Sequence, residues 1–437
     1  MSGEIVGLVA VALMLITIYV GMHIAVALIL ISFGSIWLML DPTLAVRMVA
    51  SAANDSIQDS LYGVVPLFVL MGLLVSVCGV GKDTFDVAGW LLRKIRGGLG
   101  MATVGSNAAF AAITGVSIAS AAVFSKIAVP EMMRHGHTSR FSVGVVAASS
   151  VLGMLIPPSL LLIIYGVLSE QSIGQLFIAG ILPGLLLAGF FCLLIVVMAK
   201  YFPGFVGQAG GADKALVEDE SLGSLIRKGL PIVALIMLVL GGIYTGFFTP
   251  MEAGAVGAFG AFVMTFLRRQ LTAKKLWRVL VETGHVSVSV LFLIVAASLY
   301  SRMLAMTGLP ASLTDFMMGY GFGPLEFILI YIAIILVMGC VLDSVSILLI
   351  MVPIALPIAY SFGMDPIWFG IITVVAVEIG LITPPFGLSV YTVKASLDDQ
   401  SISIKEVFLG VIPFVICMFL VLMVLVAFPW FSVALIR

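Results

Sequence analysis

Long apolar stretches separated by short polar segments run through the whole chain. A helix needs about 20 apolar residues to span the hydrocarbon core of a bilayer, and ten stretches approach this length. The predicted spans are residues 5–20, 23–40, 61–80, 141–168, 176–199, 229–247, 251–267, 284–307, 366–392 and 406–430. The pattern therefore predicts an all-α polytopic membrane protein.

Two further apolar stretches do not fit simple spans, because small or polar residues interrupt them near the middle. Residues 99–131 are interrupted at Thr114-Gly-Val-Ser117, and residues 325–360 are interrupted between Gly339 and Ser344. We expect each stretch to form a re-entrant helical hairpin that enters and leaves the membrane on one side.

The distribution of positive charge supports this topology. Short cytoplasmic loops collect Lys and Arg, and one set of alternating loops holds nearly all of them, whereas the opposite set holds only Arg47 and Arg437. If either hairpin were a full span, every later loop would change sides and the bias would vanish. Both termini are therefore predicted to lie on the side opposite the Lys- and Arg-rich loops, the periplasmic side.

Two proline pairs interrupt predicted spans in similar apolar settings. Pro157-Pro158 lies within residues 141–168, and Pro384-Pro385 lies within residues 366–392. Proline removes a backbone donor and clashes with the preceding turn, so each pair frees carbonyl oxygens at membrane depth. Interrupted helices at matching positions of two halves indicate the binding site of a secondary transporter.

The two halves also align along their length. Leu67-Phe68 aligns with Leu291-Phe292, Gly153 with Gly380, and the segment from Phe177 with that from Phe408. Because the predicted topology gives the halves opposite orientations, we expect an inverted repeat. Amphipathic segments before residues 61 and 284 look like arms between a fixed scaffold and a moving unit, so we expect an elevator mechanism. The expected division is scaffold with a first amphipathic arm (1–59), first transport unit (60–175), scaffold with a second arm (176–283), second transport unit (284–400) and scaffold helix (401–437), the arms being 43–59 and 272–283.

Composition narrows the function classes. The chain is 62% hydrophobic and only 10% charged, against roughly 25% charged residues in soluble domains. No ATP-binding or hydrolase motif is present, the four cysteines are isolated, and His135 and His137 lie in a basic loop. An intramembrane enzyme needs a nucleophile with a base or paired acids, so we do not expect this chain to be an enzyme. We also expect no cofactor beyond coupling ions and no nucleic-acid partner.

Several segments in fixed order carry a family resemblance. They are Val65-Pro-Leu-Phe-Val-Leu-Met-Gly72, Gly153-Met-Leu-Ile-Pro-Pro-Ser159, Phe177-Ile-Ala-Gly-Ile-Leu-Pro-Gly184, Phe248-Thr-Pro-Met-Glu252 and Gly380-Leu-Ile-Thr-Pro-Pro-Phe-Gly387. In this order the chain resembles the large membrane subunit, DctM type, of tripartite ATP-independent periplasmic (TRAP) transporters. The resemblance implies sodium-coupled uptake of a small organic acid by an elevator. It also implies a soluble periplasmic binding protein, a separate small four-helix subunit of DctQ type, and surrounding membrane lipid as partners.

Matching to the family motifs implies two sodium sites built mainly from main-chain oxygens. The first comprises Thr114, Gly153, Ile156 and Pro157, and the second comprises Gly339, Gly380, Thr383 and Phe386. The tip of the first hairpin departs from the Ser-Gly-Ser that is common in the family, because it has Val116 at the third position. The solute is expected between the hairpin tips, where helix N-termini attract anions. The candidate solute contacts are Gly115, Ser117, Ser120, Asp343, Ser344 and Ser346.

Four charged residues leave alternatives open. Asp343 either binds a cation or solute group or caps the second helix of its hairpin. Glu378 either orients the second sodium site, responds to protons, or makes a polar contact at the surface of the transport unit. We expect Glu252 to cap a helix. Arg302 either snorkels to the periplasmic surface or faces the solute carboxylate. A sodium/proton antiporter of related architecture is the alternative function, since Asp343 and Glu378 are acids near the site, and a channel is less well supported.

Overall fold

The computed structural model describes residues 2–58, 60–207, 221–399 and 401–436. Throughout these ranges the chain forms helices joined by loops, without a strand, which confirms the all-α prediction. By length and composition, seven helical segments of this part of the chain can cross a membrane. The number is eight if a pair bent by 69°, Val64–Val77 with Val80–Leu92, counts as one span. Residues 5–20 and 23–40 form shorter helices of 17 and 16 residues.

The first half of the chain builds one hairpin and one broken helix within a set of longer helices. Its helices are α1 (Gly3–Tyr19), α2 (Ile24–Met39), α3 (Pro42–Gln58), the 3-10 turn η1 (Ser60–Gly63), α4 (Val64–Val77), α5 (Val80–Leu92), α6 (Gly98–Thr114), α7 (Ser117–Arg134), α8 (Ser139–Ser150), α9 (Leu152–Leu155), α10 (Leu160–Ser169), α11 (Ile173–Tyr201) and α12 (Pro203–Val206). The predicted hairpin 99–131 is the pair α6 and α7, and the predicted broken span 141–168 is α8 to α10.

The second half repeats these two features. Its helices are α13 (Leu222–Tyr244), α14 (Pro250–Leu267), α15 (Ala273–Thr307), α16 (Leu309–Gly319), α17 (Pro324–Gly339), α18 (Ser344–Ser361), α19 (Pro366–Ile382), α20 (Leu388–Ser396), α21 (Ile404–Ala427) and α22 (Trp430–Val433). The predicted hairpin 325–360 is the pair α17 and α18, and the predicted broken span 366–392 is α19 and α20.

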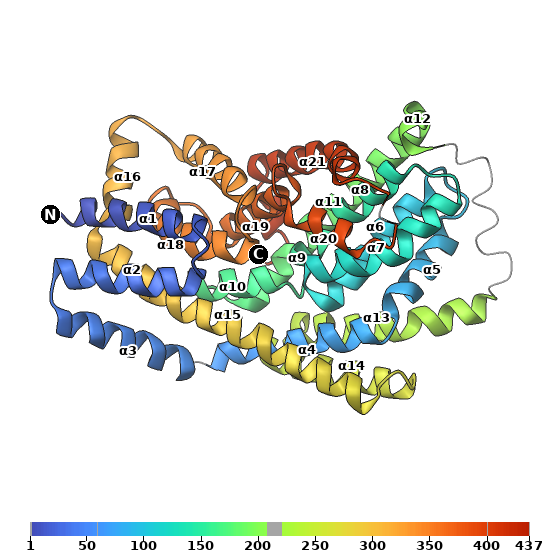
Figure 1. Cartoon of the computed structure of the whole chain (residues 1–437), viewed down its shortest axis with the longest axis horizontal. Coiled ribbons are helices and arrows are strands. Elements are labelled where there is room, and N and C mark those ends of the chain that lie inside the picture. Colours follow the sequence, from blue (N-terminus) through green and yellow to red (C-terminus); the bar gives the residue numbers. More distant parts are fainter. Residues whose placement is uncertain (1, 59, 208–220, 400, 437) are drawn as a thin grey trace.

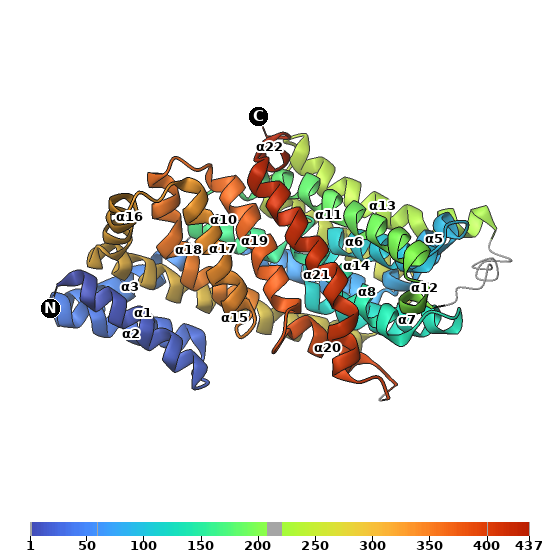
Figure 2. The ribbon, with the colours of Figure 1, turned by 90° about the horizontal axis from the view of Figure 1, so that it is seen from above.

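The broken helices occupy the middle of the molecule. α9, α10 and α19 lie centrally, and the hairpins α6–α7 and α17–α18 lie on opposite sides of them along the long axis (Figures 1 and 2). In the apolar window of Ser139–Ser169, 89% of residues are buried, against 28–33% for α13, α14 and α15. The first broken helix is therefore enclosed by protein, whereas α13 to α15 expose apolar faces.

A second group of helices forms the lower side of the molecule in Figure 1. α4 packs on α14 and α15, and α15 also packs on α2 and α3. One sequence expectation is wrong here: residues 272–283 do not form a separate connecting arm, because they are the first part of the continuous 35-residue helix α15. No proline interrupts the helix at this junction. The polar residues of 272–283 therefore make the exposed face of the first turns polar without ending the helix.

Two ion pairs attach α5 to this second group. Asp83 pairs with Arg268 at the end of α14, and Asp86 pairs with Lys228 of α13 at 2.7 Å. Asp83 and Asp86 are three residues apart, so both carboxylates lie on one face of α5. Neither α5 nor α16 is predicted from the sequence, because both are too short and too polar to be recognised as spans.

α8 and α21 cross at a close contact of two glycines. A Cβ added to Gly144 would lie 2.8 Å from the Cα of Gly410 and closer still to its carbonyl group. The two backbones therefore touch without intervening side chains, a packing that small residues permit in membrane proteins.

Replacing Gly144 with Ala is expected to lower the free energy of unfolding by about 1–3 kcal/mol, because the added methyl group overpacks this crossing. Gly105→Ala in α6 is the matched control, since a Cβ there meets nothing within 4 Å. It should leave stability unchanged or raise it by about 0.5–1 kcal/mol. Thermal unfolding of the two purified variants measures the difference, and equal melting temperatures would contradict the close crossing.

Candidate functional site

The first helix break follows directly from its proline pair. Pro157 and Pro158 have no N–H, so the carbonyls of Gly153 and Met154 lose the donors that an unbroken helix would supply four residues later. The Ser159 hydroxyl donates to the carbonyl of Met154 and accepts from the N–H of Leu162, which caps α10. One freed carbonyl is thereby satisfied within the break.

The tip of the α6–α7 hairpin docks onto this break. Gly115 adopts a left-handed conformation (φ 64°), which lets α6 end and α7 begin after two residues. Its carbonyl accepts from the N–H of Leu160 at 3.2 Å. A Cβ added to Gly153 would lie 3.0 Å from the backbone of Ser117. The structure thus brings together the first predicted set, including Thr114 at the end of α6.

α11 closes the other side of the first break. A Cβ on Gly180 would lie 2.8 Å from the carbonyl oxygen of Leu155, and one on Gly184 would lie 2.6 Å from the side chain of Ile156. Two glycines four residues apart therefore let α11 approach the unwound segment closely. Ile156 and Pro157 are buried as a result.

The second break has the same construction. Pro384 and Pro385 deprive the carbonyls of Gly380 and Leu381 of their helical donors. The N–H of Thr383 donates to the carbonyl of Gly380 at 3.0 Å, and its hydroxyl donates to the carbonyl of Ile379 at 2.6 Å. Each proline pair is joined by a cis peptide bond.

Gly339, at the end of α17, lies against this second break. A Cβ on Gly339 would come within 2.6 Å of the Cα of Gly380, so the two backbones are in contact. Gly339, Gly380 and Thr383 are therefore brought together as predicted. The Phe386 side chain is 52% exposed, and Pro384 and Pro385 are also exposed, whereas the first break is buried.

Glu378 of α19 reaches across to the opposite half of the chain. It is 1% exposed, and neither carboxyl oxygen has a hydrogen-bond partner within the described chain. The Ser117 hydroxyl at the first hairpin tip lies near this carboxyl group, and it is also buried without a hydrogen-bond partner. A buried polar group without a hydrogen bond is costly, so two unsatisfied polar groups lie between the first hairpin tip and the second broken helix.

Asp343 caps its hairpin. Its carboxylate accepts from the N–H groups of Val345 and Ser346 at 3.1 and 3.2 Å and from the Ser346 hydroxyl. Of the alternatives for Asp343, the structure supports the helix cap. The cap also engages the Ser346 hydroxyl, while Ser344 is buried at the first turn of α18.

Ser120 belongs to a buried network inside the first hairpin. It donates to the side-chain oxygen of Asn107 at 2.6 Å, and the Asn107 amide donates to Ser149 at 2.7 Å. The network joins α6, α7 and α8. In the second half, Tyr331 of α17 and Thr373 of α19 share a hydrogen bond of 3.0 Å in the same way.

Comparison with known proteins shows to which family the chain belongs. Residues 9–431 match the family described as the DctM component of tripartite ATP-independent periplasmic transporters. The chain is 36% identical over 363 residues to the C4-dicarboxylate TRAP transporter large permease protein DctM of Pseudomonas aeruginosa, with 83% of each chain covered. The chain belongs to the DctM family of TRAP transporters.

Other relatives cover nearly the full length. The sialic acid TRAP transporter large permease SiaM of Vibrio cholerae is 29% identical, with 96% of this chain and 95% of SiaM covered. The 2,3-diketo-L-gulonate TRAP transporter large permease YiaN of Escherichia coli is 31% identical, with 94% of each covered. The crystal structure of the Alcanivorax borkumensis YdaH transporter is similar in fold, with a TM-score of 0.61, 12% identity and 90% of each chain covered.

Glu252 and Arg302 of this TRAP permease make local structural contacts. Glu252 forms a capping box with Thr249, as expected. Arg302 pairs with Asp55 of α3 at 2.7 Å and also donates to Ser51. These contacts hold the pKa of the Asp55 carboxyl below its usual value. Arg302 thus has a protein carboxylate as its partner.

The hydrogen bonds of four residues were not predicted from the sequence: Asn107, Ser149, Tyr331 and Thr373. They looked like ordinary polar residues within apolar helices, and only their mutual contacts show their role. One signal was available: each residue of the first pair is 224 positions from its counterpart in the second pair (331 − 107 and 373 − 149). That separation is close to the 227 of Gly153 and Gly380 (380 − 153).

The oxygen atoms at both breaks suit a hard cation such as sodium. Main-chain carbonyls and the hydroxyls of Thr114 and Thr383 supply neutral oxygens, which bind such ions without a carboxylate. Both hydroxyls donate to carbonyls of their own helices, so their lone pairs remain available to an ion. Among the described residues no group of three His, Cys, Asp or Glu that could hold a metal ion is found.

Asp343→Ala is expected to lower the free energy of unfolding by about 1 kcal/mol, because α18 loses its cap, whereas Asp343→Asn should retain the cap and normal solute uptake. Thermal unfolding and uptake by reconstituted protein measure the two effects. Asp365→Ala is the matched control: Asp365 caps α19 through the N–H groups of Ile367 and Trp368. Loss of uptake in a fully stable Asp343→Asn variant would show a direct role beyond capping.

Proposed function

We propose that this permease carries a small carboxylate-bearing solute across the membrane together with sodium ions. The observation that supports this most is the pair of helix breaks, each with a hairpin end docked against unwound main chain. Such breaks present carbonyl oxygens to cations and helix N-termini to anions. The relatives act on C4-dicarboxylates, sialic acid and 2,3-diketo-L-gulonate, which are all organic acids.

Sodium is proposed to bind at both breaks. Thr114, Gly153, Ile156 and Pro157 would supply oxygens at the first, and Gly339, Gly380, Thr383 and Phe386 at the second. The solute would lie between the hairpin ends, where Gly115, Ser117 and Ser344 are placed near helix N-termini. Ser120, Asp343 and Ser346 already make hydrogen bonds within the protein, so we assign them to shaping these ends.

We further propose that the two halves form an inverted repeat and move as an elevator. Matched hydrogen bonds join each hairpin to its broken helix, at Asn107–Ser149 and Tyr331–Thr373. These contacts favour movement of hairpin and broken helix as one body. α11 and α21 pack on α6, α8, α9 and α19, so they are proposed to move with that body. The domain division drawn from the sequence had assigned both helices to the scaffold.

The family supports a proposal for the partners, and the loop charges support one for the orientation. TRAP transporters comprise a small membrane subunit and a periplasmic binding protein with the large permease, and we propose both as partners here. The proposed location is the bacterial inner membrane with both termini periplasmic, supported by the Lys and Arg of alternate loops. The exposed apolar faces of α13 to α15 are then available to lipid or to the small subunit.

Sodium should stabilise the purified protein in a saturable manner, because it binds the folded state only. At roughly 10 to 100 times its Kd, the gain is about 1.4–2.7 kcal/mol. Melting temperatures in sodium and potassium at equal ionic strength measure it. Thr383→Ala should weaken the sodium effect. Thr392→Ala should not, although its hydroxyl makes the same kind of bond, to the carbonyl of Leu388 at 2.9 Å. Equal stability in sodium and potassium would contradict sodium binding.

The Glu378→Gln variant distinguishes sodium coupling from proton coupling. Proton coupling is the alternative function, and the buried carboxyl group of Glu378 favours it. If Glu378 only orients the second break, a sodium gradient should still drive uptake in the variant, and a pH gradient alone should drive none in either protein. Proteoliposomes containing both membrane subunits, with binding protein outside, measure both fluxes. Uptake driven by a pH gradient in the original protein, and lost in Glu378→Gln, would favour the proton-coupled mechanism.

A further inference from the structure

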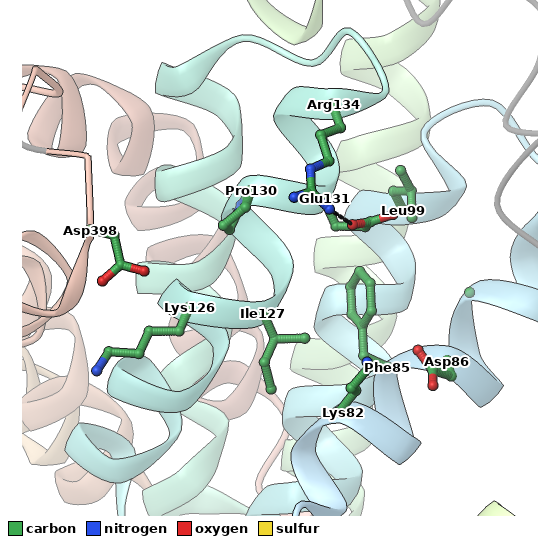
Figure 3. Close-up of a pocket in the computed structure, with 11 residues that line it drawn as sticks. Lys82, Phe85, Asp86, Leu99, Lys126, Ile127, Pro130, Glu131, Arg134 and Asp398 are labelled. Carbon is green, nitrogen blue, oxygen red and sulfur yellow. Dashed lines mark hydrogen bonds and ion pairs between the residues drawn. The ribbon is translucent and has the colours of Figure 1, made fainter.

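A pocket of about 550 Å³ lies between α5 and α7, apart from both helix breaks (Figure 3). Phe85 of α5, Leu99 of α6 and Ile127 of α7 give it an apolar interior. Charged side chains surround this interior. A cavity that combines apolar and charged walls suits an amphiphilic ligand.

Several of the charged groups are already neutralised. Asp86 pairs with Lys228 at 2.7 Å, and Glu131 pairs with Arg134 at 3.4 Å. Lys82, Lys126 and Asp398 have no hydrogen bond or ion pair within the described part of the chain. Two cations and one carboxylate therefore remain for a ligand, and they come from α5, α7 and the loop after α20.

The placement of these groups matches a zwitterionic ligand. Figure 3 shows Lys126 and Asp398 on one side of the pocket and Lys82 on the opposite side, below Phe85 of α5. A negative group bound by Lys126 would thus lie on the same side of the pocket as a carboxylate. An ammonium group attached to the ligand would meet that carboxylate.

α5 also carries signs of a position at the membrane interface. Trp90 makes a cation–π contact with Arg93, with 4.8 Å between the guanidinium carbon and the ring centroid. Leu91 and Ile95 are 65% and 41% exposed. Trp together with Arg at the end of an amphipathic helix is typical of the level of lipid headgroups.

We propose that this pocket binds the headgroup of a phospholipid that bears an amine. Lys82 and Lys126 hold its phosphate, and Asp398 faces its ammonium group. The acyl chains lie along the exposed apolar residues at the end of α5. Basic pockets between membrane helices are known to bind lipid phosphates. The site is separate from the breaks, so it does not depend on which ion or solute is transported.

Lipid retention tests the proposal. The full chain, purified with its membrane partner and stripped of lipid, is titrated with dioleoyl-phosphatidylethanolamine and followed by native mass spectrometry. Lys82→Gln and Lys126→Gln should each weaken binding about fivefold, and the double variant roughly thirtyfold. Lys274→Gln is the control, because Lys274 is exposed on α15 away from the pocket. All these side chains are exposed, so the variants should remain folded, and melting temperatures check this.

Three further comparisons test the nature of the ligand. Phosphatidylglycerol, which lacks the amine, should bind more weakly, and Asp398→Asn should narrow the difference between the two lipids. Millimolar inorganic phosphate should not displace the bound lipid. Equal retention of lipid by the double variant and the Lys274→Gln control would overturn the proposal. Displacement by inorganic phosphate would also overturn it, because the site would then take a free anion.

Discussion

The structure depends on the need to satisfy main-chain polar groups inside a membrane. An unbroken helix pairs every N–H with a carbonyl, but a proline pair removes two donors at once. The carbonyls of Gly153, Met154, Gly380 and Leu381 therefore need other partners, and each such carbonyl is costly in lipid. Packing of protein against the freed carbonyls reduces this cost, which explains why the broken helices lie at the centre and why hairpins pack against them.

Glycines let neighbouring helices approach the main chain of the two breaks closely. Gly153 admits the first hairpin tip, Gly180 and Gly184 admit α11, and Gly339 meets Gly380 across the second break. Larger side chains at these positions would hold the helices apart and let lipid reach the unwound segments. The carbonyl oxygens that need partners inside the membrane are the same ones that we propose as sodium ligands. In this proposal, packing and ion binding depend on the same few residues.

The two breaks differ in their surroundings although they share one construction. The first is buried on all sides, whereas Pro384, Pro385 and Phe386 are exposed. Glu378 of the second broken helix and Ser117 of the first hairpin tip are both buried without hydrogen-bond partners. Unsatisfied polar groups therefore lie where the two halves approach each other. Polar residues elsewhere, such as Asp343 and Arg302, are engaged in caps and ion pairs that fix individual helices.

The helical class, both hairpins, both broken helices and the family resemblance could be predicted from the sequence, because helix-breaking prolines and apolar length act locally. The spacing of the two halves also predicted that Gly339 lies near Gly380 and Gly153 near the first hairpin. Tertiary structure alone decided that residues 272–283 extend α15, that Asp343 caps α18, and that Ser120 bonds to Asn107. It also decided which lysines near α5 lack partners. These outcomes depend on which helices meet in space, and local sequence carries no record of such long-range contacts.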